Sequence, residues 1–120
     1  MRKILLVDND ITFIWGLKKY LQRRGYAVET AATLAEAREM IKQEAPLLIC
    51  SDLCLPDGSG LELLAEVRTC NKDTPFIIAS CYEKDDYEQE ALQHGVTICM
   101  DKIKSALLKD KLAEYAYKEL

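Results

Sequence analysis

The stretch that decides the fold is ILLVDND, residues 4–10, in which four apolar residues end abruptly at Asp8. A continuous apolar run of this length predicts a strand that is buried on both faces of a parallel sheet. The residues that follow, Asp8, Asn9 and Asp10, then lie at the end of that strand. Carboxylates in such a place either hold a metal ion or attack a phosphate, and the rest of the sequence has to decide between these uses.

Short apolar runs recur along the chain, and patterns with helical spacing separate them. This alternation predicts five β-α units. Right-handed crossovers then favour an α/β fold with a doubly wound, five-stranded parallel sheet in the order 2-1-3-4-5. The predicted strands are Ile4–Val7, Tyr26–Thr30, Leu47–Cys50, Phe76–Ala79 and Val96–Met100.

Capping signals mark several of the predicted helices. The first helix ends at Gly25, a favourable residue just after a helix. The second begins at Thr33 and the third at Ser59, each with a glutamate three residues later, which is the pattern of a capping box. The fourth, Glu83–Gln93, is highly charged, and the fifth places Leu108, Leu112 and Tyr115 on one face.

Composition bounds the class of protein. The chain has 120 residues, of which 49% are apolar, and we expect one domain over 1–120, either a whole protein or the N-terminal part of a longer one. A net charge of −4 argues against direct nucleic-acid binding, and no apolar run is long enough to span a membrane. We therefore expect a cytoplasmic protein. The 5 cysteines form no CxxC and accompany a single histidine, so we expect reduced, mostly buried thiols and no zinc site.

Polar side chains follow the predicted strands where each one ends. Asp8 follows the first strand, Asp52 the third, Ser80 the fourth and Lys102 the fifth. In open α/β sheets the ligand crevice lies beyond the carboxyl ends of the strands, where the winding direction switches. Two carboxylates that face each other across the crevice suit Mg²⁺, while a lysine and a hydroxyl suit a phosphoryl group. The pattern predicts phosphoryl transfer to an oxygen nucleophile.

Four segments resemble the response-regulator receiver domain of two-component signalling, the CheY-like variant of the flavodoxin-like fold. They are LLVDND, LLICSDLCLPDGSGLELL, PFIIAS and GVTICMDK, in this order and on the predicted strand ends. The resemblance covers essentially the whole chain. It implies a phosphorylated signalling domain that is not an enzyme acting on an external substrate.

The resemblance also implies roles for particular residues. Asp52 is the implied phosphoacceptor, with a sensor histidine kinase or a phosphotransfer protein as the donor. Ser80 and Lys102 are the implied contacts of the phosphoryl group. The signal then passes through the face made by the fourth helix, fifth strand and fifth helix to an output domain or docking partner, with a homodimer as one form of response. The implied Mg²⁺ ligands are Asp8, Asn9, Asp52 and the backbone carbonyl of Cys54.

Three residues depart from the family pattern. Asn9 stands where a second acid is usual, so we expect weaker Mg²⁺ binding, with Asp10 capping the first helix rather than replacing the missing charge. Ile103 replaces a proline, which predicts a differently shaped loop and a less firmly placed Lys102. Cys99 occupies the position of a switch aromatic and is too small to swing as a ring does.

Further residues flank the predicted site. Tyr82 is expected either to cover the phosphoryl group or to lie exposed in a loop. Cys54 and Cys81 are expected on loops beside the site, as ordinary small residues rather than as thiol sensors, because nothing near them in the sequence lowers a thiol pKa. Trp15, in the first predicted helix, is expected to serve packing rather than binding.

Two alternative functions remain at this stage. Asn9, Ile103 and Cys99 leave open a degenerate receiver that serves as a phosphate-independent docking or dimerisation module. The stretch LLVDNDIT also resembles haloacid-dehalogenase-type phosphatases, in which Asp8 would attack phosphate and Asp10 would act as acid and base. The phosphatase is disfavoured because the chain is short for that fold and because the Asp52 segment would have no role.

Overall fold

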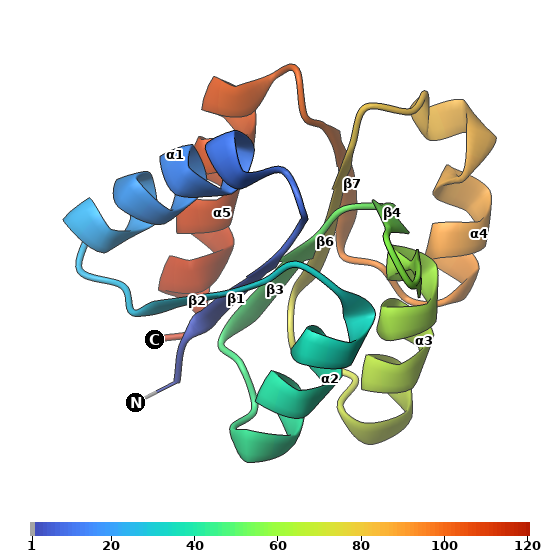
Figure 1. Ribbon diagram of the computed structural model, residues 1–120, viewed down its shortest axis with the longest axis horizontal. Coiled ribbons are helices and arrows are strands. Elements are labelled where there is room, and N and C mark those ends of the chain that lie inside the picture. The colour runs from blue at the N-terminus through green and yellow to red at the C-terminus, as the bar shows by residue number, and fades with distance from the viewer. Residues whose placement is uncertain (1) are drawn as a thin grey trace.

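Five parallel strands form the central sheet of the computed structural model, which describes residues 2–120. The sheet lies between two layers of helices (Figure 1). Its order, β2-β1-β3-β6-β7, is the predicted order 2-1-3-4-5 once strands are counted within this sheet, so the predicted fold class is confirmed. In spatial order the strands are β2 (Val28–Ala31), β1 (Ile4–Val7), β3 (Leu48–Ser51), β6 (Phe76–Ser80) and β7 (Ile98–Asp101).

Helices α1 and α5 cover one face of the sheet, and α2, α3 and α4 cover the other (Figure 1). The predicted fourth helix is divided into a short 3₁₀ helix, η1, and a six-residue α4. Its many charged residues leave few apolar contacts to stabilise a longer helix there. The helices are α1 (Ile11–Arg23), α2 (Leu34–Gln43), α3 (Gly60–Cys70), η1 (Lys84–Asp86), α4 (Glu88–Gln93) and α5 (Ser105–Lys118).

The core consists of two apolar layers, one on each side of the sheet. Successive side chains of a strand point to opposite faces. Leu5 and Val7 of β1 therefore pack toward α2 and α3, while Ile4 and Leu6 pack toward α1 and α5. All four are buried, which explains why this strand is apolar throughout rather than alternating.

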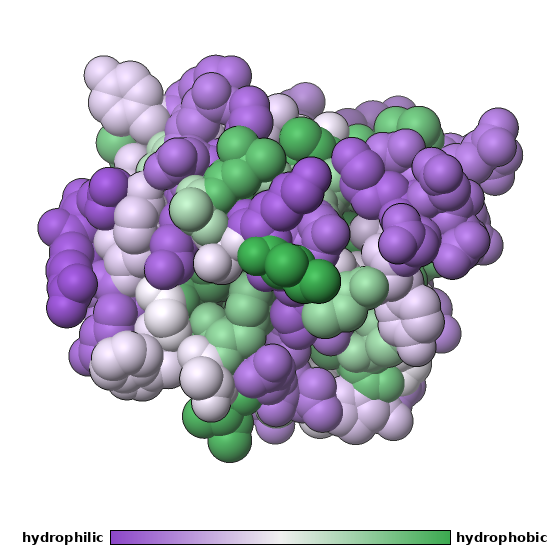
Figure 2. Space-filling model, turned by 90° about the horizontal axis from the view of Figure 1, so that it is seen from above, coloured by the Kyte–Doolittle hydropathy of each residue, from purple (hydrophilic) through white to green (hydrophobic). Residues whose placement is uncertain are grey.

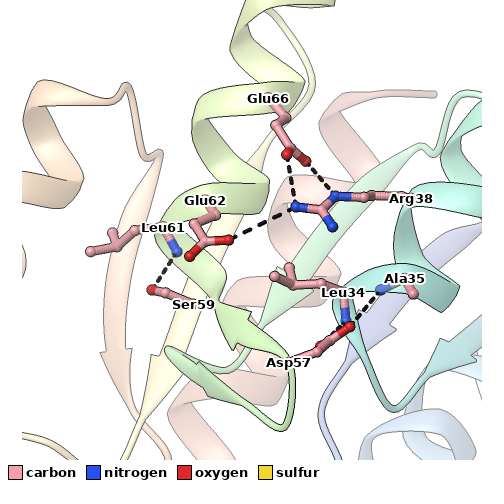
Figure 3. Close-up of polar contacts among 8 residues, drawn as sticks. All are labelled: Leu34, Ala35, Arg38, Asp57, Ser59, Leu61, Glu62 and Glu66. Atoms are coloured by element: carbon pink, nitrogen blue, oxygen red, sulfur yellow. Dashed lines mark hydrogen bonds and ion pairs between the residues drawn. The ribbon is translucent and has the colours of Figure 1, made fainter.

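The helix starts agree with the predicted caps in part. Asp10 accepts a hydrogen bond from the Phe13 N–H at the start of α1, and Thr33 accepts one from the Glu36 N–H at the start of α2. Ser59 also caps its helix, but through the Leu61 N–H. The predicted partner in that capping box, Glu62, instead places its carboxylate 3.8 Å from the guanidinium of Arg38 on α2 (Figure 3).

A small hairpin follows Asp52 and was not predicted from the sequence. Its strands are β4 (Cys54–Leu55) and β5 (Gly58–Ser59), which pair antiparallel around Pro56 and Asp57. The Asp57 carboxylate accepts hydrogen bonds from the backbone N–H groups of Leu34 and Ala35, at 2.7 and 3.0 Å (Figure 3). The hairpin thus supplies a second cap to α2, because the first N–H groups of a helix lack partners within it.

Further contacts fix the hairpin and α3 beside Asp52. The Arg38 guanidinium of α2 makes two hydrogen bonds with the Glu66 carboxylate of α3, at 2.9 and 2.8 Å (Figure 3). Gly60, the first residue of α3, lies so close to Asp52 that a Cβ added there would collide with the Asp52 carbonyl oxygen. The glycine at this position is therefore required by close backbone approach rather than by flexibility.

The five cysteines are free thiols, as predicted, but they are not mostly buried. Cys50 and Cys99 lie in the core, where burial raises the pKa of the Cys50 thiol to about 12 and that of the Cys99 thiol to about 11. Cys54, Cys70 and Cys81 are exposed. Among residues 2–120, no helix combines the length and the apolar content that crossing a membrane requires.

Candidate functional site

The carboxyl ends of β1 and β3 bring Asp8 and Asp52 to the same edge of the sheet. The two strands are hydrogen-bonded neighbours, and the Asp52 N–H donates to the Val7 carbonyl oxygen at 2.8 Å. The chain winds in opposite directions from β1 and from β3, so the two acids lie where the sheet order reverses. This is the place at which ligands bind in open α/β sheets, as the sequence predicted.

Lys102 joins the two acids from the end of β7. Its ammonium nitrogen Nζ lies 2.8 Å from Oδ2 of Asp8 and 3.6 Å from Oδ2 of Asp52. The side chains of Asp8, Asp52 and Lys102 are only 2%, 15% and 10% exposed. The site is therefore a nearly buried cluster of two carboxylates and one ammonium in which Asp52 is the most accessible carboxylate.

The other carboxylate oxygen of Asp8 and the carboxylate of Asp10 each accept a hydrogen bond from a different backbone N–H group. Oδ1 of Asp8 accepts a hydrogen bond from the Asp10 N–H at 2.9 Å. The Asp10 carboxylate accepts from the Phe13 N–H, so Asp10 caps α1, as predicted. A carboxylate held in this way is poorly placed to serve as the acid and base that the phosphatase alternative requires.

Burial and the neighbouring carboxylate set the charge state of Asp52. Desolvation and then the charge of Asp8 raise the pKa of the Asp52 carboxyl, while Lys102 and the backbone N–H groups of Leu53 and Cys54 oppose them. The pKa of Lys102 is raised as well: burial lowers it, but the hydrogen bond and charge of Asp8 outweigh this effect. Lys102 therefore stays protonated and partly offsets the repulsion between the two acids.

Ser80 lies fully buried at the end of β6. Its hydroxyl oxygen accepts a hydrogen bond from the Tyr82 N–H at 3.0 Å, and its carbonyl oxygen accepts one from the Lys102 N–H at 3.0 Å. In the sheet Ser80 is paired with Asp101, directly before the lysine. The backbone thus couples the serine of one strand end to the lysine of the next.

Tyr82, Cys54 and Cys81 lie near the cluster, and all three are exposed. The neighbouring Cys54 thiol is the first of the influences that raise the pKa of the Tyr82 phenol, and the charge of Asp52 is another. The Cys81 thiol is close enough to Lys102 to affect its pKa. Tyr82 therefore leans toward the Asp52 loop while 58% of its surface stays exposed.

Cys99 packs against a buried tyrosine in the same apolar layer, on the α2, α3 and α4 side of the sheet. Tyr87, directly before α4, is 6% exposed, and its hydroxyl has no hydrogen-bond partner of good geometry. The Cys99 thiol is a close polar neighbour, since the Tyr87 phenol influences its pKa. A ring supplied by the α4 segment therefore packs beside the small side chain at position 99.

Asn9 directly follows Asp8 and is exposed. Together with Asp8, Ile11 and Trp15 it lines a hollow of about 280 Å³ between α1 and β2. Trp15 is 61% exposed, against the expectation that its role is packing. Within residues 2–120 no three or more His, Cys, Asp or Glu side chains gather as a metal site, and a cation here would depend on backbone, amide and water oxygens as well.

Phe13 belongs to the site and was missed in the sequence. The ring, on the first turn of α1, lies under the Lys102 ammonium with 4.4 Å between Nζ and the ring centroid. The loop after Lys102 is fixed by a hydrogen bond from the Ile103 N–H to the Asp101 carboxylate at 2.9 Å. Lys102 is thus held by Asp8 and Phe13, against the expectation of a loosely placed lysine. The sequence feature that could have indicated this role is an aromatic residue three positions after the helix cap Asp10.

The model of the response regulator receiver domain family matches residues 4–113. This chain belongs to that family. A receiver domain protein from Methanospirillum hungatei has a similar structure, with a TM-score of 0.89 and 28% identity, over 99% of this chain and 96% of that one. The predictions of a two-component receiver domain and of a CheY-like fold are therefore both confirmed.

Other relatives are longer than this chain. The photosynthetic apparatus regulatory protein RegA of Cereibacter sphaeroides is 31% identical over 101 residues, which are 84% of this chain and 55% of that protein. The chain spans about half the length of the first curated relatives it matches. A response regulator from Burkholderia pseudomallei, whose structure has a phosphorylated aspartic acid, a calcium ion and citrate, is 27% identical with a TM-score of 0.80, over 98% of this chain and 75% of that one.

Proposed function

We propose that this receiver domain accepts a phosphoryl group on Asp52 from a histidine kinase or a phosphotransfer protein. One observation carries the proposal: the Asp52 carboxylate stands at the strand switch point, partly accessible, with the Lys102 ammonium at 3.6 Å and buried Asp8 beside it. The phosphorylated aspartic acid in the Burkholderia response regulator supports the same chemistry. The opposed influences on the Asp52 pKa suit a carboxylate that must be both ionised and accessible.

The transfer needs few protein groups. A carboxylate oxygen of Asp52 forms the new bond to phosphorus while the bond from phosphorus to the donor nitrogen breaks, and the electron pair leaves with that nitrogen. The product is an acyl phosphate. The Lys102 ammonium, already next to Asp52, then pairs with a phosphoryl oxygen, and the N–H groups of Leu53 and Cys54 help to orient the carboxylate.

We propose Mg²⁺ as the cofactor of this site. The oxygen donors available are the carboxylates of Asp8 and Asp52, the backbone carbonyl of Cys54 and, at the edge, the amide of Asn9. They fit a hard cation, and Oδ2 of Asp8 is buried with Lys102 as its charged neighbour. The bound ion would neutralise negative charge on the carboxylates and on the incoming phosphoryl group.

The output would follow from a local change at Ser80. In this proposal the serine gives up its bond with the Tyr82 N–H and turns its hydroxyl toward the phosphoryl group. The face made by α4, β7 and α5 then repacks and contacts an output domain, a docking partner or a second copy of the chain. The short α4 and its sparse apolar contacts support such a change, since segments of this kind open at low free-energy cost.

The surface around the site supports a protein donor. Four apolar side chains near the strand ends are exposed, and Figure 2, which looks onto this end of the molecule, shows apolar side chains among hydrophilic ones. Exposed apolar side chains near the site suit a protein partner with an apolar surface of its own. The four are Ile11, Trp15, Ile103 and Leu107.

One experiment tests the proposal against its two alternatives. The protein is incubated with Mg²⁺ and acetyl phosphate, and the adduct is located by mass spectrometry after borohydride trapping. We expect a label on Asp52 that is absent in Asp52→Asn. A label on Asp8 would instead indicate the phosphatase, and an unlabelled protein would indicate the phosphate-independent docking module.

A further inference from the structure

We propose that Phe13 is a positioning residue that holds the Lys102 ammonium at the two acids. The evidence begins with geometry: Nζ of Lys102 lies 4.4 Å from the ring centroid and 2.8 Å from Oδ2 of Asp8. The ammonium is therefore confined between an aromatic face and a carboxylate. The consequence for phosphorylation rests on the proposed function of Asp52, whereas the placement of the ammonium does not.

The ring is itself firmly placed. The Phe13 N–H donates to the Asp10 carboxylate at 3.1 Å, which fixes the first turn of α1. The side chain is half-buried and packs against the apolar layer under α1 and α5. Asp10 thus affects the site indirectly, because it fixes the backbone of Phe13. The stretch NDITF, residues 9–13, therefore both starts α1 and supports Lys102.

Lysine needs such a support because its side chain is long and flexible. A carboxylate attracts the ammonium from one side only, and here it lies closer to Asp8 than to Asp52, at 2.8 against 3.6 Å. An aromatic face attracts a cation over a broad area, most strongly when the cation is shielded from water, and the Lys102 side chain is only 10% exposed. The ring can therefore keep the ammonium near both acids while allowing it to move toward a phosphoryl group on Asp52.

The placement can be tested in the unphosphorylated protein by NMR. Protons above an aromatic face are shifted upfield by the ring current. We expect upfield-shifted Lys102 Cε protons in the parent and in Phe13→Tyr, which retains the ring, and ordinary shifts in Phe13→Leu, which retains only apolar bulk. Ordinary shifts in the parent, or shifts unchanged in Phe13→Leu, would overturn the proposal whether or not Asp52 accepts phosphate.

The effect on reactivity is measured with the same variants. With Mg²⁺ and acetyl phosphate we expect Phe13→Leu to be phosphorylated about three- to tenfold more slowly than the parent, the range that a partly desolvated cation–π contact supports, with Phe13→Tyr near the parent rate. Equal rates in all three proteins would overturn the positioning role. A parent that takes no phosphate would instead contradict the proposed function, and the NMR comparison would still decide the placement of Lys102.

Discussion

The Lys102 ammonium lies 2.8 Å from Oδ2 of Asp8, a carboxylate whose side chain is only 2% exposed. Removing one member of a buried ion pair leaves the other uncompensated and costs about 3–5 kcal/mol. Asp52, at 3.6 Å from the same ammonium, would then repel Asp8 without a cation between them. The lysine therefore contributes to stability as well as to the proposed chemistry.

We predict that Lys102→Met lowers the free energy of unfolding by about 3 kcal/mol at pH 7. Lys102 lowers the pKa of the Asp52 carboxyl, so without the ammonium this carboxyl holds its proton more tightly in the folded chain than in the unfolded one, and the loss should be smaller at pH 5. Urea unfolding at both pH values measures this. Lys104→Met, at an exposed lysine of the same loop, is the control and should change little. A Lys102→Met variant as stable as the control would contradict the prediction.

Asp52→Asn should make the protein more stable at neutral pH. Because the pKa of the Asp52 carboxyl is raised from its ordinary value of 3.8, the folded chain binds more protons than the unfolded chain just above that pH. The free energy of unfolding then falls as the pH rises through this window, and the asparagine variant lacks this loss. Its advantage over the parent should be present at pH 7 and shrink toward pH 3. The exposed acid variant Asp73→Asn controls for net charge, and a gain of equal size there would refute the explanation.

Local patterns in the sequence were sufficient to predict the sheet. Runs such as Ile4–Val7 and Phe76–Ala79 are apolar throughout because both faces of each strand are buried. Burial on both faces therefore appears in the sequence as consecutive apolar residues. The gathering of Asp8, Asp52 and Lys102 could also be predicted, since parallel strands place their carboxyl ends at one edge. The position of Ser80 at the same edge could be predicted for the same reason.

Contacts between distant segments leave no comparable local pattern. The hairpin after Asp52 has strands of only two residues, and its Asp57 cap on α2 depends on tertiary placement. The contact of Phe13 with Lys102 likewise joins opposite ends of the chain. The exposure of Trp15 was missed because the helical pattern of α1 does not by itself show which apolar residues lie at the edge of the buried face.

Restoring the second acid should strengthen Mg²⁺ binding. We expect Asn9→Asp to bind Mg²⁺ about three- to tenfold more tightly than the parent, because it adds a negative charge beside the proposed cation site. Fluorescence of Trp15, which lines the same hollow as Asn9, provides the titration signal. Asp10→Asn retains the helix cap and should leave the affinity within about twofold if Asp10 is not a ligand. An unchanged affinity in Asn9→Asp would exclude position 9 from the site.

Gly60→Ala should destabilise the loop that carries Asp52. The added Cβ would collide with the Asp52 carbonyl oxygen and lie 3.0 Å from the Ser51 hydroxyl, and neither group is the flexible end of a long side chain. We expect a loss of about 2–3 kcal/mol in urea unfolding, together with slower phosphorylation. Gly16→Ala is the matched control: it has open space around it in α1, so it should gain about 0.5–1 kcal/mol. Equal effects of the two substitutions would show that Gly60 is not packed as described.

Tyr87→Phe should not destabilise the protein, although Tyr87 is one of its buried aromatic residues. Its hydroxyl has no hydrogen-bond partner of good geometry, and burial raises the pKa of the phenol. Removing an unpaired buried hydroxyl while keeping the ring should leave stability unchanged or raise it by about 1 kcal/mol. Thermal or urea unfolding measures the difference, with Tyr82→Phe, at an exposed ring, as the control. A loss above about 1 kcal/mol specific to Tyr87→Phe would mean that the hydroxyl has a bonding partner, for which the neighbouring Cys99 thiol is the first candidate.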